Sequence, residues 1–330
     1  MNSSSPSHSK ALMVLLFSIV LWGIGPLFIK YFTRFYDPWT QNAFRYSCAA
    51  LMLLLAVPFQ RRTSFRLTRG QWIKLGLVVL PNVGLQITYA SMFYFLYPSV
   101  AGLVVRTSIL FVCFLSFLFF ADERPIIRSG GFLLGAVLGL VGLVAIIAGQ
   151  DPEILSRLQV SQTSFWIGVA IALGYAFFLA VYTLMIKRLV RDVPPIVSFT
   201  HVSWMTSVVM ILLMLKFGCP SDLWTAPLEP LGWMVFTAFV NIIVAHTTLY
   251  AALREIKAVV SSTLMLLTPF ITCVGSVLIY GDRLSAVQIA GGGSVLVGAW
   301  LAGLAQARLQ SRPADLAVVE KPEDTRRVSE

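Results

Sequence analysis

Residues 11–31 read ALMVLLFSIVLWGIGPLFIKY, an almost uninterrupted apolar stretch. A helix that crosses the roughly 30 Å of bilayer hydrocarbon needs about 20 such residues, because each residue rises about 1.5 Å. The stretch is longer than the core of a secretory signal, no small-residue cleavage site follows it, and Lys30 leads directly into further apolar sequence. It therefore predicts a first transmembrane helix.

Nine further apolar stretches follow, each bounded by polar residues or by glycine and proline. They lie near 39–59, 73–94, 99–120 and 131–149 in the first half, and near 166–186, 196–216, 231–252, 258–280 and 287–304 in the second. Charged residues make up 12% of the chain and the mean hydropathy is +0.80, whereas a soluble domain carries about 25% charged residues. We expect an all-α integral membrane protein with about ten transmembrane helices.

The two halves of the chain match at a fixed offset. A shift of 159 residues pairs polar positions as well as apolar ones: Asn82 with Asn241, Glu123 with Asp282, and Arg124 with Arg283. Because each half holds five spans, an odd number, the second half enters the bilayer from the opposite side. We predict two inverted five-helix repeats, at 1–150 and 160–305, and a disordered cytoplasmic tail at 306–330.

The positions of the basic residues predict the orientation. With a cytoplasmic N-terminus, inner segments hold 18 of the 25 lysines and arginines and outer segments hold five, which leaves Arg45 and Arg106 within spans. An excess of basic residues marks the cytoplasmic side, so we expect both termini there. The compact loops suit a bacterial inner membrane. The net charge of +10 thus reflects topology, and no nucleic-acid partner is expected.

Short motifs at matching places in the spans resemble a known family. They are Leu21-Trp22-Gly23 with Pro26 and Lys30, Phe44-Arg45-Tyr46, Glu123-Arg124-Pro125, Thr268-Pro269-Phe270 and Gly281-Asp282-Arg283-Leu284. Together they resemble the EamA-like members of the drug/metabolite transporter superfamily over nearly the whole chain. The resemblance implies ten spans in two inverted halves and transport of a small organic metabolite, often outward. Because the fourth span lacks the proline of the ninth, we expect the fourth to bend less there.

Arginine within a span is a candidate for function, because a charge at the bilayer centre costs roughly 2.5–3.5 kcal/mol on insertion scales. Arg106 lies about a third of the way into the fourth span, and its repeat partner is Met265, so the scaffold alone does not require a cation. Arg106 is suited to bind a carboxylate or phosphate, or to hold helices together through backbone carbonyls. Arg45 lies nearer the start of its span, within snorkelling reach of the interface, which favours a structural role.

Polar residues form a stripe in the third span. Asn82, Gln86 and Tyr89 recur at helical spacing and share one helix face, which suits either the wall of a polar cavity or a contact between helices. The eighth span offers a looser counterpart in His246 and Tyr250, four residues apart.

Two further groups of residues are candidates for substrate contact and for gating. Trp22 and Tyr175 could stack against a substrate, although aromatic residues within bundles also serve packing. Gly23, Gly25 and Pro26 interrupt the first span, and Pro269 interrupts the ninth, so these four are candidate hinges of a gate. Close helix packing through small residues is the alternative.

The acidic residues indicate how transport is coupled. All fifteen are placed in loops, at span edges or in the tail, so no carboxylate is expected mid-membrane to carry a proton or bind sodium. We therefore expect facilitated diffusion or exchange. Proton coupling through His201 and His246, the titratable span residues near neutral pH, is the alternative.

These patterns predict a secondary transporter, an exporter or exchanger of a small organic metabolite such as an amino acid or organic acid, that works by alternating access between inverted halves. The expected partners are this small-molecule substrate and the lipid bilayer; no cofactor, metal or oligomeric state is predicted. No phosphate-binding loop, His-Glu-x-x-His motif or paired intramembrane carboxylates occur, so we do not expect an enzyme. A membrane-embedded lipid-acting enzyme and an accessory membrane subunit are the alternatives.

Overall fold

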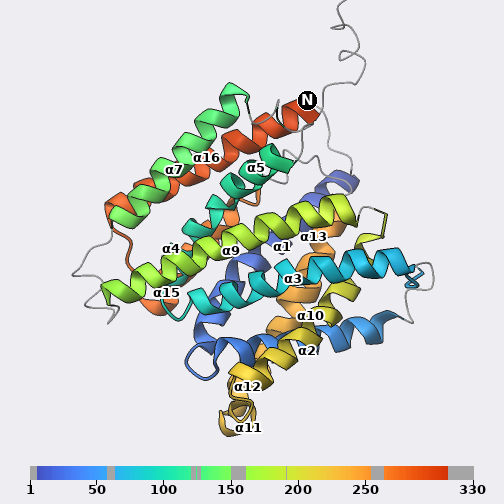
Figure 1. Ribbon diagram of the computed structural model, residues 1–330. Coiled ribbons are helices and arrows are strands. Elements are labelled where there is room, and N and C mark those ends of the chain that lie inside the picture. Colours follow the sequence, from blue (N-terminus) through green and yellow to red (C-terminus); the bar gives the residue numbers. More distant parts are fainter. Residues whose placement is uncertain are drawn as a thin grey trace, which may run out of the picture.

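A computed structural model of the chain describes residues 6–57, 64–119, 124, 128–149, 161–190, 192–253 and 264–310. These residues form helices and short connections, and the described part contains no strand (Figure 1). Eight of its helical segments are long and apolar enough to cross a membrane. The predicted all-α, multi-pass membrane class is therefore confirmed.

The membrane-crossing segments lie where the apolar stretches predicted them. They are α1 (Pro6–Phe32), α3 (Arg69–Met92), α4 (Pro98–Val104) with η2 (Val105–Thr107) and α5 (Ser108–Phe119), α7 (Gly130–Ala148), α9 (Gln162–Leu189), α10 (Pro195–Phe217), α12 (Leu228–Thr237) with η4 (Ala238–Val244) and α13 (Ala245–Leu253), and α16 (Ala286–Gln310). A short helix, α11 (Asp222–Thr225), lies between α10 and α12.

Two helices occupy the remaining predicted spans without reaching the length and hydropathy of the other eight. They are α2 (Pro38–Ala56) and α15 (Leu267–Tyr280). The buried face of α2 carries Gln41, Asn42 and Arg45, which lowers its hydropathy. The 14 residues of α15 are fewer than the roughly 20 that cross a bilayer.

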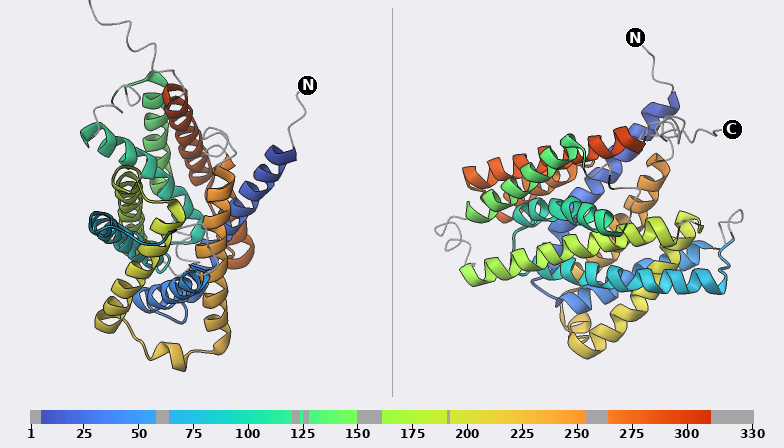
Figure 2. Two further views of the ribbon diagram at one scale, coloured as in Figure 1. Left: turned by 90° about the vertical axis from the view of Figure 1, so that its right-hand side faces the viewer. Right: turned by 45° about the horizontal axis from the view of Figure 1, so that its top comes forward.

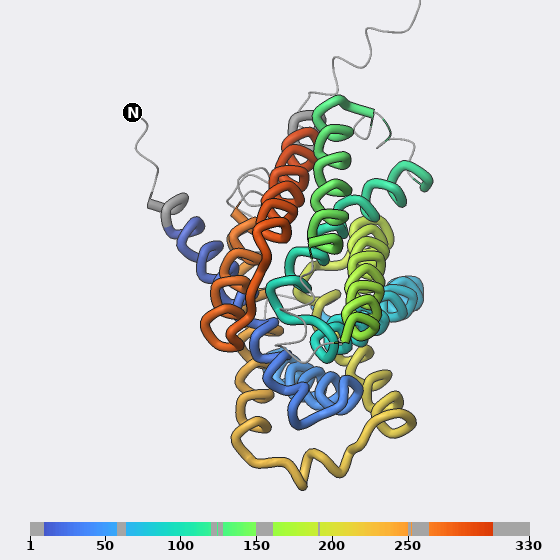
Figure 3. The backbone as a smooth tube through the Cα atoms, turned by 90° about the vertical axis from the view of Figure 1, so that its left-hand side faces the viewer, coloured from blue at the N-terminus to red at the C-terminus, as the bar shows by residue number. Residues whose placement is uncertain are grey.

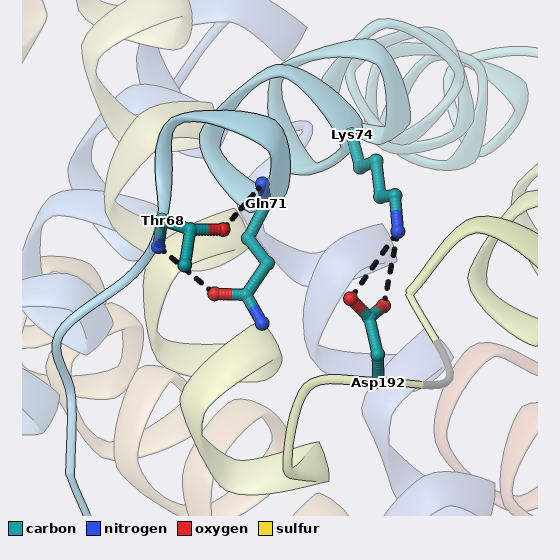
Figure 4. A network of polar contacts seen from close by, with 4 residues as sticks. All are labelled: Thr68, Gln71, Lys74 and Asp192. Carbon is teal, nitrogen blue, oxygen red and sulfur yellow. Dashed lines mark hydrogen bonds and ion pairs between the residues drawn. The ribbon is translucent and has the colours of Figure 1, made fainter.

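Local sequence sets where the helices begin. The Asp37 carboxylate caps α2 by accepting hydrogen bonds from the Trp39 and Thr40 amides at 2.8 and 3.0 Å. Thr68 and Gln71 form a reciprocal capping box at the start of α3 (Figure 4).

The antiparallel helices α7 and α16 lie side by side along their lengths (Figures 1 and 3). A Cβ atom added to Gly142 would lie 2.5 Å from the Gly291 carbonyl oxygen, and one added to Gly135 would lie 2.5 Å from that of Gly298. Backbone therefore packs against backbone at two levels, which residues with side chains would prevent. Where α7 ends and α16 begins, the Ser285 hydroxyl donates to the Gly149 carbonyl oxygen at 2.5 Å.

The helices of the bundle share two ends. We name the first the Tyr94 end; it comprises residues 33–37, 93–97, 218–227 and 281–285. We name the second the Lys74 end; it comprises residues 64–74 and 192–194. At the Lys74 end, the Lys74 ammonium and the Asp192 carboxylate form an exposed ion pair at 3.2 Å (Figure 4).

The hydrophobic core differs between these ends. At the Tyr94 end a single cluster joins α1, α3, α4, α7, α9, α12 and α16. The described core contains three further clusters, of which a small one joins α2 to η4 and two lie towards the Lys74 end. One of these two joins the start of α3 to the end of α9 and the start of α10, and the other joins the first half of α1 to α13. Figure 2 shows α1 diverging from α7 and α9 in that direction.

Two spans depart from α-helical geometry midway. The fourth span is interrupted by the 3-10 turn η2. The expectation that it bends less than the ninth span stays a prediction, because residues 258–263 of the ninth span lie outside the described residues. The eighth span contains the π-helical segment η4, a geometry that occurs frequently at functional sites. Arg106 lies in η2 and Asn241 lies in η4.

The ends of the predicted domains fall partly beyond the described residues. Helix α16 continues to Gln310, past the residue at which the tail was expected to begin. Residues 311–330, 150–160 and 258–263 and the acidic residue Glu123 lie outside the described part.

Candidate functional site

Polar and aromatic side chains from seven helical segments gather midway along the bundle. We name this group the central cluster; it comprises Trp22, Gly25, Arg45, Tyr46, Tyr89, Arg106, Tyr175, Asn241 and His246. Five of its residues were predicted as substrate contacts from the sequence. The cluster therefore brings together candidates from both halves of the chain.

The side chain of Tyr89 extends from α3 towards α9. Its ring centroid is 5.2 Å from that of Tyr175 and 5.3 Å from that of Phe93. The helices α3 and α9 pack along each other, as Figures 1 and 2 show. The two phenols are thus held together by the packing of their helices.

Arg106 places a guanidinium group at the 3-10 turn within the fourth span. It interacts electrostatically with Tyr175, its Nε atom is buried without a hydrogen-bond partner, and the side chain as a whole stays partly accessible. A buried charged group of this kind is costly unless something pairs with it. Arg106 therefore meets the physical requirement for a ligand-binding cation.

Arg45 does not snorkel to the interface, and the expectation that it would is wrong. The side chain is 4% exposed and interacts electrostatically with Tyr89 and Tyr46, and its Nε atom is buried without a hydrogen-bond partner. The sequence analysis weighed Arg45 as an intramembrane arginine and favoured a structural role for it, and it did not consider Tyr46 for the site. The available signal was the pairing of an arginine with a tyrosine inside an apolar stretch.

Trp22 and His246 form the other side of the cluster. The His246 ring lies 5.1 Å from the Trp22 ring and 5.0 Å from the Phe199 ring, and stacks on the latter at 20°. These contacts join α1, α10 and α13. The side chain of Tyr250, also predicted here, lies outside the described part of the chain.

Gly25 connects the two sides. A Cβ atom at this position would lie 2.5 Å from Asn241 Nδ2 and 3.8 Å from the Tyr89 hydroxyl group. The absence of a side chain on α1 therefore lets an amide from η4 and a phenol from α3 approach each other.

Asn82 and Gln86 hold helices together in this structure. Asn82 Nδ2 donates to the Thr206 hydroxyl of α10 at 2.8 Å, and Gln86 Nε2 reaches Asn82 Oδ1 at 3.5 Å. The Gln86 carbonyl oxygen accepts from Asn42 Nδ2 at 2.9 Å. The polar stripe of the third span thus divides, because Tyr89 faces the central cluster while Asn82 joins α3 to α10.

The candidate hinge residues lie at close helix contacts. A Cβ atom at Gly23 would lie 2.7 Å from the Ile271 side chain of α15, and the Gly23 carbonyl oxygen accepts from the Thr272 hydroxyl at 2.7 Å. Helix α1 is continuous through Gly23, Gly25 and Pro26 in this structure, and Pro269 lies in the first turn of α15. Their role as hinges stays a prediction.

Asp282 is buried at the Tyr94 end. It is 2% exposed and accepts hydrogen bonds from the Ser99 hydroxyl of α4 and, at 2.8 Å, from the Ser276 hydroxyl of α15. Lys30 Nζ donates to the Phe93 carbonyl oxygen at 2.7 Å in the same region. These bonds join both halves of the chain at this end.

Tyr94 adds a further connection. Its hydroxyl group donates to the Tyr36 carbonyl oxygen and accepts from Gln41 Nε2 at 2.9 Å. Burial raises the pKa of the Tyr94 phenol, so the group stays protonated and able to donate.

Asp37, Cys219 and Asp222 lie at the same end, and the atoms with which they could bind a metal ion are within 4.8 Å of one another, a grouping that the sequence did not predict.

Comparison with known proteins points to one family. Residues 9–148 and 166–304 each match the family model described as the EamA-like transporter family. An uncharacterized transporter of Bacillus subtilis, YyaM, is 23% identical over 278 residues, which cover 82% of this chain and 85% of the relative. An uncharacterized transporter of Haemophilus influenzae is 21% identical over 302 residues, which cover 88% of this chain and 96% of the relative. A solved crystal structure with 18% identity shares the fold, with a TM-score of 0.58 over 92% of this chain and 99% of that one.

Proposed function

The chain belongs to the EamA-like transporter family, and from this membership we propose that it is a secondary transporter of a small organic metabolite such as an amino acid or organic acid. It exports or exchanges this substrate and binds it in the central cluster. The cluster is the observation that carries the proposal, because it brings two arginines and three tyrosines from four predicted spans together inside the bundle. Its relatives are named transporters rather than enzymes.

The mechanism we propose is alternating access between two inverted halves, 1–150 and 160–305. The antiparallel packing of α7 and α16, the fifth helix of each half, supports it, because an odd number of spans inverts the second half. The unequal cores also support it, because a single cluster at the Tyr94 end and two at the Lys74 end fit a transporter closed at one end.

The orientation we propose follows from the basic residues. The Lys74 end faces the cytoplasm, together with both termini and the tail 306–330, in a bacterial inner membrane. The Tyr94 end then faces outward. In this orientation the state described here is closed to the outside.

Counterflow in vesicles tests the function. Purified protein is reconstituted alone, and exchange of labelled amino acids, organic acids and neutral amines is measured against protein-free vesicles. Exchange of at least one soluble compound is expected, because counterflow requires only a binding site that reaches both faces in turn. If folded protein exchanges none of them, and mass spectrometry shows altered lipids in the same vesicles, the lipid-acting enzyme replaces the transporter. If it neither exchanges solutes nor alters lipids, the accessory subunit replaces it.

A further inference from the structure

We propose that the substrate is an organic acid with net negative charge, bound by Arg45 beside Tyr89 and by Arg106 beside Tyr175. This proposal rests on the proposed transport function. It chooses organic acids over amino acids and amines as the substrate class. It also assigns binding to Arg45, whose position near the start of its span suggested a structural role.

One pair of packed tyrosine rings relates the two arginines. Arg45 interacts electrostatically with Tyr89, the Tyr89 ring lies 5.2 Å from the Tyr175 ring, and Tyr175 interacts with Arg106. The second, third, fourth and sixth spans supply these four side chains. The two guanidinium groups therefore flank one pair of phenols.

No described carboxylate reaches this pair of arginines. The electrostatic partners of Arg45 and Arg106 are tyrosines. The described acidic residues all lie at helix ends or in connections: Asp37, Asp192, Asp222, Glu229 and Asp282. Within the described chain, the ion pair between Lys74 and Asp192 is the single one formed. The described part of the central cluster thus carries positive charge without a neutralising anion.

An anionic ligand would stabilise the guanidinium groups of Arg45 and Arg106. Charged groups out of contact with water are stable when paired and hydrogen-bonded, and the Nε atoms of both Arg45 and Arg106 are buried without a partner. Guanidinium groups bind carboxylates through two parallel hydrogen bonds, and phenol hydroxyl groups donate to the remaining oxygen lone pairs. A carboxylate held by the two guanidinium groups, beside the packed Tyr89 and Tyr175 rings, would satisfy these requirements together.

An ammonium group fits the same place poorly. It would lie near two positive charges, and no described carboxylate would bind it. An amino acid would thus lose part of what its carboxylate gains, whereas an organic acid would not.

The test compares ligands of matched size on the purified, full-length protein. Binding of lactate, succinate and glutarate is measured by thermal unfolding and compared with alanine, 4-aminobutyrate and ethanolamine at constant ionic strength. We expect the organic acids alone to stabilise the protein. Arg45→Gln and Arg106→Gln should each weaken organic-acid binding at least about tenfold, because each removes a charge-assisted hydrogen bond. Arg34→Gln is the matched control, because Arg34 is exposed at the Tyr94 end, and it should bind like the wild type.

Each result decides the proposal. Equal stabilisation by alanine or ethanolamine, or unchanged organic-acid affinity in both glutamine variants, would overturn it. Where a glutamine variant does not fold, Arg→Lys replaces it; we expect it to keep the preference for anions with weaker affinity, because lysine cannot form the two parallel bonds. Unchanged affinity in the lysine variants would equally overturn the assignment. Counterflow of alanine but of no organic acid would remove this proposal and leave the transporter intact, whereas no exchange of any solute would remove the proposed function.

Discussion

At the Tyr94 end of the bundle one hydrophobic core joins helices of both halves, whereas at the Lys74 end the described core is divided into two clusters. The polar contacts differ in the same way. Asp282 is 2% exposed and is held by two hydroxyl groups, while the Asp192 side chain is 47% exposed and forms an ion pair with Lys74. A carboxylate therefore contributes to stability at one end and hardly at the other, because water competes for it only where it is exposed.

This difference suggests which contacts a transport cycle must break. In the alternating access proposed above, opening the Tyr94 end would separate a buried polar network and a continuous core, whereas the contacts described at the Lys74 end are an exposed ion pair and two smaller cores. The helices α7 and α16 contact each other along their lengths, so we expect this pair to stay packed when either end opens.

The largest effect should come from the contact between α7 and α16. Gly291→Leu would place a side chain where even a Cβ atom lies 2.8 Å from the Gly142 carbonyl oxygen, so the helices must separate. We expect a loss of about 3 kcal/mol or more, seen as loss of monodisperse protein in detergent. Gly293→Leu is the control, because a Cβ atom at Gly293 meets nothing within 4 Å. Equal yields of monodisperse protein for the two variants would show that close packing of α7 against α16 is not required for a stable bundle.

The next effect should come from Asp282. Asp282→Ala leaves the Ser99 and Ser276 hydroxyl groups without their shared acceptor, at a cost of about 2–4 kcal/mol, and so favours opening of the Tyr94 end. Cys273 reports on this opening, because its thiol lies 3.8 Å from the Ser99 carbonyl oxygen.

The measurement is the rate of maleimide labelling of Cys273 in detergent, with the other three cysteines replaced by alanine. We expect Asp282→Ala to label several-fold faster than its parent. Arg283→Ala is the control, because Arg283 is the exposed neighbour in sequence and should label at the parent rate. A Tyr94 end that is held closed by other contacts would give equal rates for all three proteins.

A smaller effect is expected at Tyr94. Tyr94→Phe removes the donor to the Tyr36 carbonyl oxygen and the acceptor for Gln41 Nε2, at a cost of about 1–2 kcal/mol in the free energy of unfolding. Tyr97→Phe serves as the control, because it keeps the ring on which the Lys30 ammonium lies, 4.8 Å from the centroid. Both thermal stability and Cys273 labelling should change less than in Asp282→Ala. A larger change would move the main closing contact from Asp282 to Tyr94.

Much of this architecture follows from the sequence, because long apolar stretches fix where helices cross a membrane. The observed ends of α3 and α10 differ from the predicted ones by only a few residues. The turns η2 and η4 could not be predicted, since local departures from α-helical geometry depend on packing against other helices. The contact between α7 and α16 could not be predicted either, because glycines on one helix face do not show which other helix packs against them.

The candidate site was predictable in kind and less so in detail. Arg106, Tyr89 and Tyr175 lie together because polar residues within membrane spans usually face the interior of the helix bundle and not the lipid. The burial of Arg45 was not predicted, because its position along the helix does not show that Tyr89 and Tyr46 lie near it. Asn82 joined α10 instead of the cluster, since one helix face can meet two different neighbours.

The smallest effect should come from the ion pair at the Lys74 end. The hydrogen bond from Lys74 lowers the pKa of the Asp192 carboxyl below its usual value near 4. A carboxyl group whose pKa is lower in the folded state stabilises the protein above its unfolded pKa, and this contribution is lost as the pH falls through the folded value. Asp192→Asn should therefore unfold at nearly the wild-type temperature at pH 7, and the small difference should shrink as the pH falls below about 4 through the lowered folded pKa, and also in high salt. A difference at pH 7 as large as that of Asp282→Ala would contradict the contrast between the ends, because it would show that the exposed contact holds the Lys74 end as firmly as the buried network holds the other.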